Sequence, residues 1–137
     1  MTQRKLLALL VSDAGQSLES LRILLKAQGI EVRMSGTCAE AARLLEQARP
    51  ELIFTTIEHA DGTWSDIVTL AGKAVAPANV IVVAKSHDVR LYLAAMECGA
   101  FDYILPPFER ESVNHIVRVA AENVRRRREA LATQAVA

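Results

Sequence analysis

The sequence is poor in aromatic residues, in net charge and in cysteine. These shortages exclude several classes of protein and of binding site. Aromatic residues make up 4% of the 137 residues, and 16 basic side chains balance 16 acidic ones. A net charge of zero provides no overall field that would attract nucleic acid or an anionic membrane. Cys38 and Cys98 stand far apart without metal-ligand spacing, so we expect two reduced, partly buried thiols and no disulfide.

Long hydrophobic runs are also missing. No apolar stretch approaches the ~20 residues that a membrane span requires. The apolar run at 6–11 is short and no small-residue cleavage site follows it, so the N-terminus does not match a signal peptide. Hydrophobic residues nevertheless reach 51% and charged residues 23%, a composition typical of folded domains. We therefore expect one cytoplasmic domain with a sizeable core.

Short apolar runs alternate with helical patterns along the chain. The runs cover 5–11, 30–34, 51–56, 80–84 and 102–105. This alternation predicts a parallel sheet with helices on both faces. Right-handed crossovers then favour a flavodoxin-like, doubly wound α/β fold with five strands in the order 2-1-3-4-5.

The last two helical segments carry regular apolar stripes. Ser86 or Asp88 is placed to cap the first of them. For this helix the spacing predicts an inward face made of Val89, Leu93 and Met96. The second helix starts near Glu109, and its predicted inward face is longer: Val113, Val117, Ala120 and Val124.

Three segments lie at the predicted strands and resemble one known family. They read LLALLVSDA, PELIFTTIEHADG and MECGAFDYILPPF. The chain resembles the receiver domain of bacterial two-component response regulators, and the third segment is similar to that family's Gly-Ala, Asp-Tyr and Lys-Pro-Phe signature. The resemblance implies the CheY-like fold and a receiver-like domain over 1–124. A basic and then Ala-rich extension of the last helix follows at 125–137.

The resemblance also implies where phosphoryl chemistry would take place. Receivers accept a phosphoryl group on an Asp after the third strand. An acidic pair helps to hold Mg²⁺, and a Thr or Ser and a Lys bind the phosphoryl oxygens. The matching positions here are Ser12, Asp13, Thr56, Ala84 and Pro106. Only Asp13 keeps its chemical group, and one carboxylate is a weak Mg²⁺ site.

A threonine hydroxyl needs an adjacent base before it can act as a nucleophile. We therefore predict that Thr56 only hydrogen-bonds, either to the backbone or to Asp13. The chain is then a degenerate pseudo-receiver with no catalytic residues, no cofactor and no resident metal.

Other parts of the family's signalling apparatus persist. Tyr103 matches the aromatic residue of the fifth strand that the family uses as a switch. In the family this residue turns inward or outward together with the Thr or Ser after the fourth strand, and Ala84 at that position has no hydroxyl. Pro107 follows Pro106 where the family has Lys-Pro, so we predict a cis bond. Receivers pair or dock through the face made of helix 4, strand 5 and helix 5. On this face we expect an exposed apolar patch of four residues: Tyr92, Leu105, Ile116 and Val119.

The leading hypothesis is a phosphorylation-independent signalling module that dimerises or docks to a protein partner. One alternative is a small-ligand sensor in the vacated phosphorylation pocket, and another is a receiver phosphorylated at an atypical site such as Asp13. Nucleic-acid binding through the arginines at 125–128 has weak support, because no aromatics interleave them. A solvated helix end is the favoured interpretation of that run. His59, His87 and His115 share no site, and we expect all three on the surface.

Overall fold

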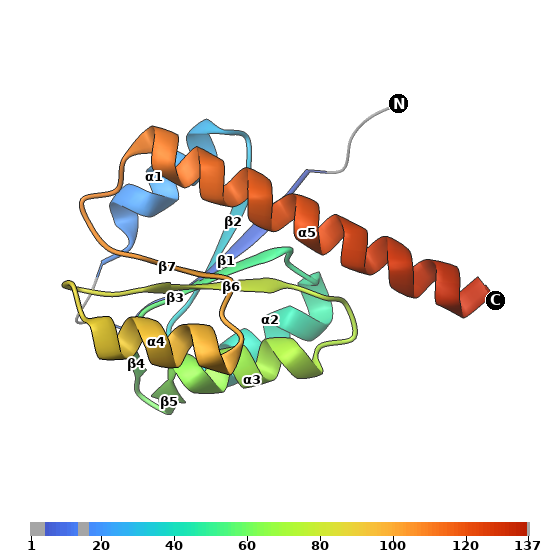
Figure 1. Cartoon of the computed structure of the whole chain (residues 1–137), viewed down its shortest axis with the longest axis horizontal. Coiled ribbons are helices and arrows are strands. Elements are labelled where there is room, and N and C mark those ends of the chain that lie inside the picture. The colour runs from blue at the N-terminus through green and yellow to red at the C-terminus, as the bar shows by residue number, and fades with distance from the viewer. Residues whose placement is uncertain (1–4, 14–16, 137) are drawn as a thin grey trace.

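A parallel five-stranded sheet forms the centre of the molecule, and helices cover both faces (Figure 1). This computed structural model describes residues 5–13 and 17–136, so residues 1–4, 14–16 and 137 of the predicted segments lie outside the description. The sheet strands are β1 Leu7–Val11, β2 Glu31–Ser35, β3 Leu52–Thr55, β6 Asn79–Val83 and β7 Asp102–Ile104. Their order is β2-β1-β3-β6-β7, with every pair parallel. The predicted flavodoxin-like order is thus confirmed.

The helices alternate with these strands and form two layers. They are α1 Glu19–Ala27, α2 Cys38–Ala48, α3 Trp64–Lys73, α4 Val89–Cys98 and α5 Arg110–Val136. Helices α1 and α5 cover one face of the sheet, and α2, α3 and α4 cover the other (Figure 1). A short antiparallel hairpin, β4 Glu58–His59 and β5 Gly62–Thr63, stands between β3 and α3, where the sequence analysis predicted no strands.

The central strands supply both hydrophobic layers. Successive strand side chains point to opposite faces, so a strand buried on both sides must be apolar throughout. Leu10 and Phe54 pack in the layer beneath α1 and α5. Leu9 and Ile53 pack in the layer formed with α2 and α3. This double burial explains why the runs at 6–11 and 80–84 show no alternation.

Helix α4 faces the opposite way from our prediction. Val89, Leu93 and Met96 are 57%, 52% and 39% exposed, so their predicted inward position is wrong. Ala95 is the buried residue of α4 and packs in a small cluster with Val82 of β6. Apolar residues lie on both sides of this helix, and periodicity alone does not decide which side contacts the sheet. The side of α4 that carries Ala95 is small, so it can approach the sheet more closely than the side that carries Leu93.

Helix α5 carries its predicted inward stripe, and all four residues of that stripe are buried. The helix continues past the predicted domain boundary at 124, and its C-terminal end projects beyond the sheet (Figure 1). The expected solvated end is confirmed for Arg126, which pairs with Glu122 at the surface. It is wrong for Arg128, which is half-buried and donates to the Pro77 carbonyl at the amino edge of the sheet. Arg127 is exposed as expected, although it also donates to Asn79 Oδ1. Within the described ranges, no helix has both the length and the apolarity of a membrane span.

We expect the substitution Phe54→Ala to lower the free energy of unfolding by about 3–5 kcal/mol, because it leaves a cavity in the fully buried layer beneath α1 and α5. Ile23→Ala on the exposed side of α1 is the control and should change it by less than about 0.5 kcal/mol. Urea denaturation followed by circular dichroism measures both. Equal losses in the two variants would contradict this placement of the core.

Candidate functional site

Three of the predicted phosphorylation-site positions border one cavity at the carboxyl edge of the sheet. Asp13, Thr56 and Ala84 follow β1, β3 and β6, and the cavity that they line has a volume of about 250 Å³. Ser12 and Pro106 have different surroundings. The Ser12 N–H donates to the Ser35 carbonyl at 3.0 Å, and Pro106 is exposed. The structure therefore brings together part of the predicted set.

Charged residues outside the predicted phosphorylation-site set also line the cavity, together with the apolar side chains of Ile57 and Leu91. Glu58 and Lys85 lie on its border, and so does Asp88, whose carboxylate also accepts the Leu91 N–H at 3.1 Å and caps α4. Glu58 was missed because the sequence pattern does not predict the short strand β4, which places this residue beside the cavity. Three carboxylates and one ammonium group make a poor cradle for a phosphoryl anion.

The donor set does not fit the Mg²⁺ ion that the receiver family uses. Over residues 5–13 and 17–136, no group of three or more His, Cys, Asp or Glu side chains is arranged to hold a metal ion. Mg²⁺ needs near-octahedral oxygen ligands, usually from one or two carboxylates together with phosphate oxygens. Asp13 is the one carboxylate at the family's metal position, which is fewer oxygen ligands than Mg²⁺ requires.

Thr56 is buried and bonded to the backbone. Its side chain and backbone together are 1% exposed. The Thr56 N–H donates to the Val11 carbonyl at 3.0 Å, and its hydroxyl donates to the same carbonyl at 3.4 Å. The backbone hydrogen bond predicted for this hydroxyl is therefore present. With its proton directed at a carbonyl, the hydroxyl has no base to activate it.

His59 is buried, so its predicted surface position is wrong. The hairpin turns the residue inward, leaving it 8% exposed, with Nε2 2.8 Å from the Thr55 hydroxyl oxygen. The Thr55 hydroxyl donates to the Thr56 carbonyl, so it accepts the proton on Nε2. In the described part of the chain, Nδ1 has no hydrogen-bond partner. His87 and His115 are exposed, as predicted.

Burial lowers the pKa of His59 below its ordinary value of 6.5, although Asp13, Asp61 and Asp66 act in the opposite direction. The ring is therefore neutral at neutral pH. A proton added to Nδ1 would create a buried cation with an unpaired donor.

Asp61 connects the hairpin to α2. Its two carboxylate oxygens accept the N–H groups of Cys38 at 2.7 Å and Ala39 at 3.0 Å. These hydrogen bonds at a helix N-terminus lower the pKa of Asp61. Burial raises the pKa of the Cys38 thiol to about 11, and Asp61 adds to the effect. Both cysteines are free as predicted, although Cys98 is exposed and not partly buried.

Tyr103 joins β7 to the loop before α4. Its hydroxyl lies 3.4 Å from the carbonyl oxygens of both Ser86 and Asp88. Its ring meets Tyr92 of α4 edge-on, with centroids 5.6 Å apart and planes at 84°. The Pro106–Pro107 peptide bond is cis, which confirms the prediction.

The predicted apolar patch is only partly exposed. Tyr92 and Val119 are each 42% exposed, and Leu105 is half-buried. Ile116 is half-buried like Leu105 and packs against the core cluster, so these two residues are less exposed than predicted. Ile116 follows Val113 by three residues, and this spacing places it at the margin of the inward stripe of α5.

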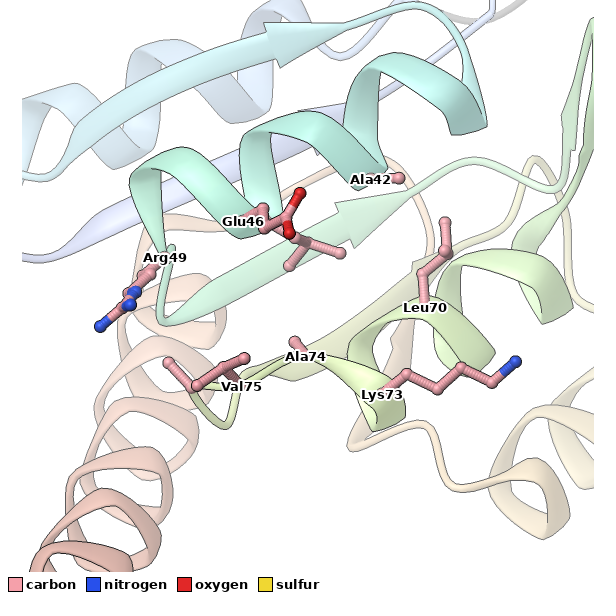
Figure 2. Close-up of a pocket in the computed structure, with 9 residues that line it drawn as sticks. Ala42, Glu46, Arg49, Leu70, Lys73, Ala74 and Val75 are labelled. Atoms are coloured by element: carbon pink, nitrogen blue, oxygen red, sulfur yellow. The ribbon is translucent and has the colours of Figure 1, made fainter.

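A second groove lies at the opposite, amino edge of the sheet and contains none of the predicted site residues. It has a volume of about 340 Å³ and lies between α2 and the segment that joins α3 to β6. Figure 2 shows Glu46, Arg49 and Lys73 around it, with Val75 on the connecting segment.

Comparison with known proteins connects the chain to response regulators. No known family model matches the sequence. The chain is 33% identical to the sensory transduction protein LytT of Bacillus cereus over 107 residues, which cover 77% of this chain and 43% of LytT. It is 32% identical to the transcriptional regulatory protein KdpE of Mycobacterium tuberculosis over 103 residues, 74% of this chain and 45% of KdpE. The chain thus spans less than half the length of these curated relatives.

Solved structures show the same fold. A CheY-like response regulator receiver domain protein from Methanospirillum hungatei superposes with a TM-score of 0.77 at 19% identity, covering 90% of this chain and 99% of that one. The beryllofluoride-activated NtrC4 receiver domain dimer gives a TM-score of 0.74 at 22% identity, covering 85% and 98%. The sequence relatives and the fold together support the assignment of this chain as a response regulator receiver domain.

We expect the free energy of unfolding to fall as the pH drops below 6.5, the ordinary His pKa. Below this pH His59 binds a proton in the unfolded chain, whereas the buried ring in the folded protein stays neutral because its pKa is lowered. This contribution is complete above that pH and is lost progressively until the lowered folded pKa is reached. Urea denaturation between about pH 7 and pH 5 should show this slope.

The slope should be reduced in His59→Gln and unchanged in the exposed control His115→Gln. Histidine NMR titration of the folded protein gives the pKa directly. A His59 pKa at or above the ordinary value would contradict the expected direction.

Proposed function

We propose that this receiver domain is a cytoplasmic regulatory module that works without phosphoryl transfer, by docking to a protein surface through α4, β7 and α5. The observation that carries the proposal is the outward face of α4. Large apolar side chains occupy it at the spacing of one helical stripe: Val89, Tyr92, Leu93 and Met96, which are 39–57% exposed. Contiguous exposed apolar surface of this kind is typical of interaction sites.

The composition of the carboxyl-edge cavity supports independence from phosphorylation. Thr56 at the end of β3 offers a hydroxyl bonded to a carbonyl instead of a carboxylate. Ala84 has no donor for a phosphoryl oxygen, and Glu58 adds negative charge. An incoming phosphoryl group would meet no carboxylate nucleophile at the end of β3, and among the described lining residues Lys85 is the one cation against three carboxylates.

The contacts of Tyr103 support a face held in one arrangement. The hydroxyl bonds to the loop before α4, and the ring packs against Tyr92. Neither contact requires a hydroxyl at position 84. Tyr103 thus connects β7 to α4 without a hydroxyl at position 84, the group that couples this aromatic residue to phosphorylation in the family.

A second copy of the chain is the first occupant to test. The NtrC4 receiver, which shares this fold, was solved as a dimer. An apolar stripe on a single helix can pack against the same stripe of a second copy about a twofold axis. A separate protein partner is the other possible occupant of this face.

The small-ligand alternative has one structural support. The cavity beside Asp13 and Thr56 has a mixed lining, and the three carboxylates in it suit a small cationic ligand. It ranks second because Thr56, the central group of the site, is already hydrogen-bonded within the protein.

NMR titration with Mg²⁺, and then with Mg²⁺ and beryllofluoride, tests the phosphorylation part of the proposal. Beryllofluoride mimics a phosphoryl group on an aspartate, and Thr56 offers none. We expect the amide shifts of Asp13, Thr56 and Ala84 to stay unchanged. Saturable shifts that spread from these residues to Tyr103 would show a working phosphorylation switch and overturn this part.

Sedimentation over a range of protein concentrations tests the docking face. We expect Tyr92→Glu and Leu93→Glu to weaken self-association by at least roughly tenfold, since each places a charge in an apolar contact. Ile23→Glu on α1 is the matched control, because it makes the same change at an exposed apolar residue of another face. A wild-type protein that stays monomeric throughout would exclude self-docking. Unchanged association in both α4 variants would exclude this face.

A further inference from the structure

Two arginines near the end of α5 turn back onto the amino edge of the sheet. The Arg128 guanidinium donates to the carbonyl oxygens of Pro77 at 2.9 Å and of Arg49 and Pro50 at 3.1 Å. Its Nη1 also lies 3.8 Å from the Glu51 carboxylate. One side chain of α5 therefore contacts the segments that lead into both β3 and β6.

Asn79 forms a second link between α5 and the sheet. It is 6% exposed at the start of β6, and its side-chain oxygen accepts Arg127 Nη1 at 2.8 Å. Its amide nitrogen donates to the Ala120 carbonyl at 2.9 Å and to Asn123 Oδ1 at 3.0 Å. A single buried amide thus joins three positions of α5 to one strand.

Glu51 extends this network to a third strand. It is 7% exposed, and its Oε1 accepts the Leu7 N–H of β1 at 3.1 Å while Oε2 faces Arg128. A carboxylate buried to this degree is costly without a paired cation and hydrogen bonds. The charge on Glu51 and the position of Arg128 therefore depend on each other.

The helix continues past these contacts. The segment 129–136, called the arm below, is shorter than the ~12–15 residues that an isolated helix needs to be stable in water. Its first turns border a groove of about 400 Å³, with Leu131 on one side and Val75 on the other. Leu131 is 47% exposed, so packing of the arm on the domain is slight. Its order must come mainly from the anchored turn before it.

We propose that Arg127 and Arg128 act as a clasp that fixes the direction of the arm relative to the sheet. The clasp makes the arm a rigid continuation of the domain, whose orientation is set by the strand ends and not by the arm's own packing. Several directed hydrogen bonds from a planar guanidinium define an orientation, which a single ion pair does not. This inference does not rest on the proposed docking face, because the clasp lies at the other edge of the sheet.

The distance between two spin labels measures the direction of the arm. The labels are placed at Gln47→Cys on α2 and Ala132→Cys on the arm, both exposed positions, in a Cys38→Ala, Cys98→Ser background. Pulsed electron–electron double resonance should give one narrow distance distribution when both arginines are present. Arg128→Ala should lose that single narrow peak, and the arm amides should lose protection from hydrogen exchange.

Arg126→Ala is the matched control, since it removes a neighbouring arginine and its ion pair with Glu122 but leaves the clasp intact. It should keep the narrow distribution. Arg128→Lys serves if Arg128→Ala does not fold, because an ammonium group keeps the charge but cannot reach the three carbonyls together. A folded Arg128 variant with the wild-type distance distribution would overturn the proposal. Equal broadening in Arg126→Ala would also overturn it, because the effect would then not be specific to the clasp.

Discussion

Burial of the central strands on both faces is the constraint on which the rest of the structure depends. Leu9, Leu10, Ile53 and Phe54 point alternately into two apolar layers, which leave no room for polar chemistry along the strands. Polar groups are therefore found at the two edges where the strands end. The carboxyl edge holds the cavity beside Thr56, and the amino edge holds the network around Asn79. Each edge collects residues that are distant in the sequence because parallel strands all end on the same side.

The sequence was a reliable guide wherever one pattern had one structural solution. Non-alternating apolar runs separated by helices permit few topologies, and the predicted strand order is the observed one. The hydrogen bond of the Thr56 hydroxyl was predicted in the same way, because a hydroxyl at the end of a buried strand needs a nearby acceptor. The cavity positions Asp13 and Ala84 were predicted from the family resemblance. The contribution of Glu58 was not, since the hairpin that carries it depends on tertiary contacts such as the Asp61 cap on α2.

The wrong predictions share a physical cause. A local sequence pattern does not specify which part of the fold a side chain will contact. Helix α4 is apolar on two sides, and only the sheet decides that Ala95 and not Leu93 approaches it. A histidine in a polar segment looks exposed until a tight hairpin turns it toward Thr55. An arginine run has the composition of a solvated helix end. Arg128 differs because it donates to the carbonyls of Arg49, Pro50 and Pro77, which are far away in sequence and lie at the edge of the sheet.

Helix α5 is the element that spans both edges, which gives the two proposals a common framework. Near its start Val119 lies on the proposed docking face, and near its end Arg127 and Arg128 contact the strand starts. The buried stripe from Val113 to Val124 packs the helix along the sheet. A helix held at many points moves as a unit or not at all, because packed interiors do not deform continuously. A partner bound at α4 would therefore meet an α5 whose position, including that of the arm, is already determined by the sheet. In the arrangement that we propose, the domain would act through the surfaces that it presents together, without a chemical change at Thr56.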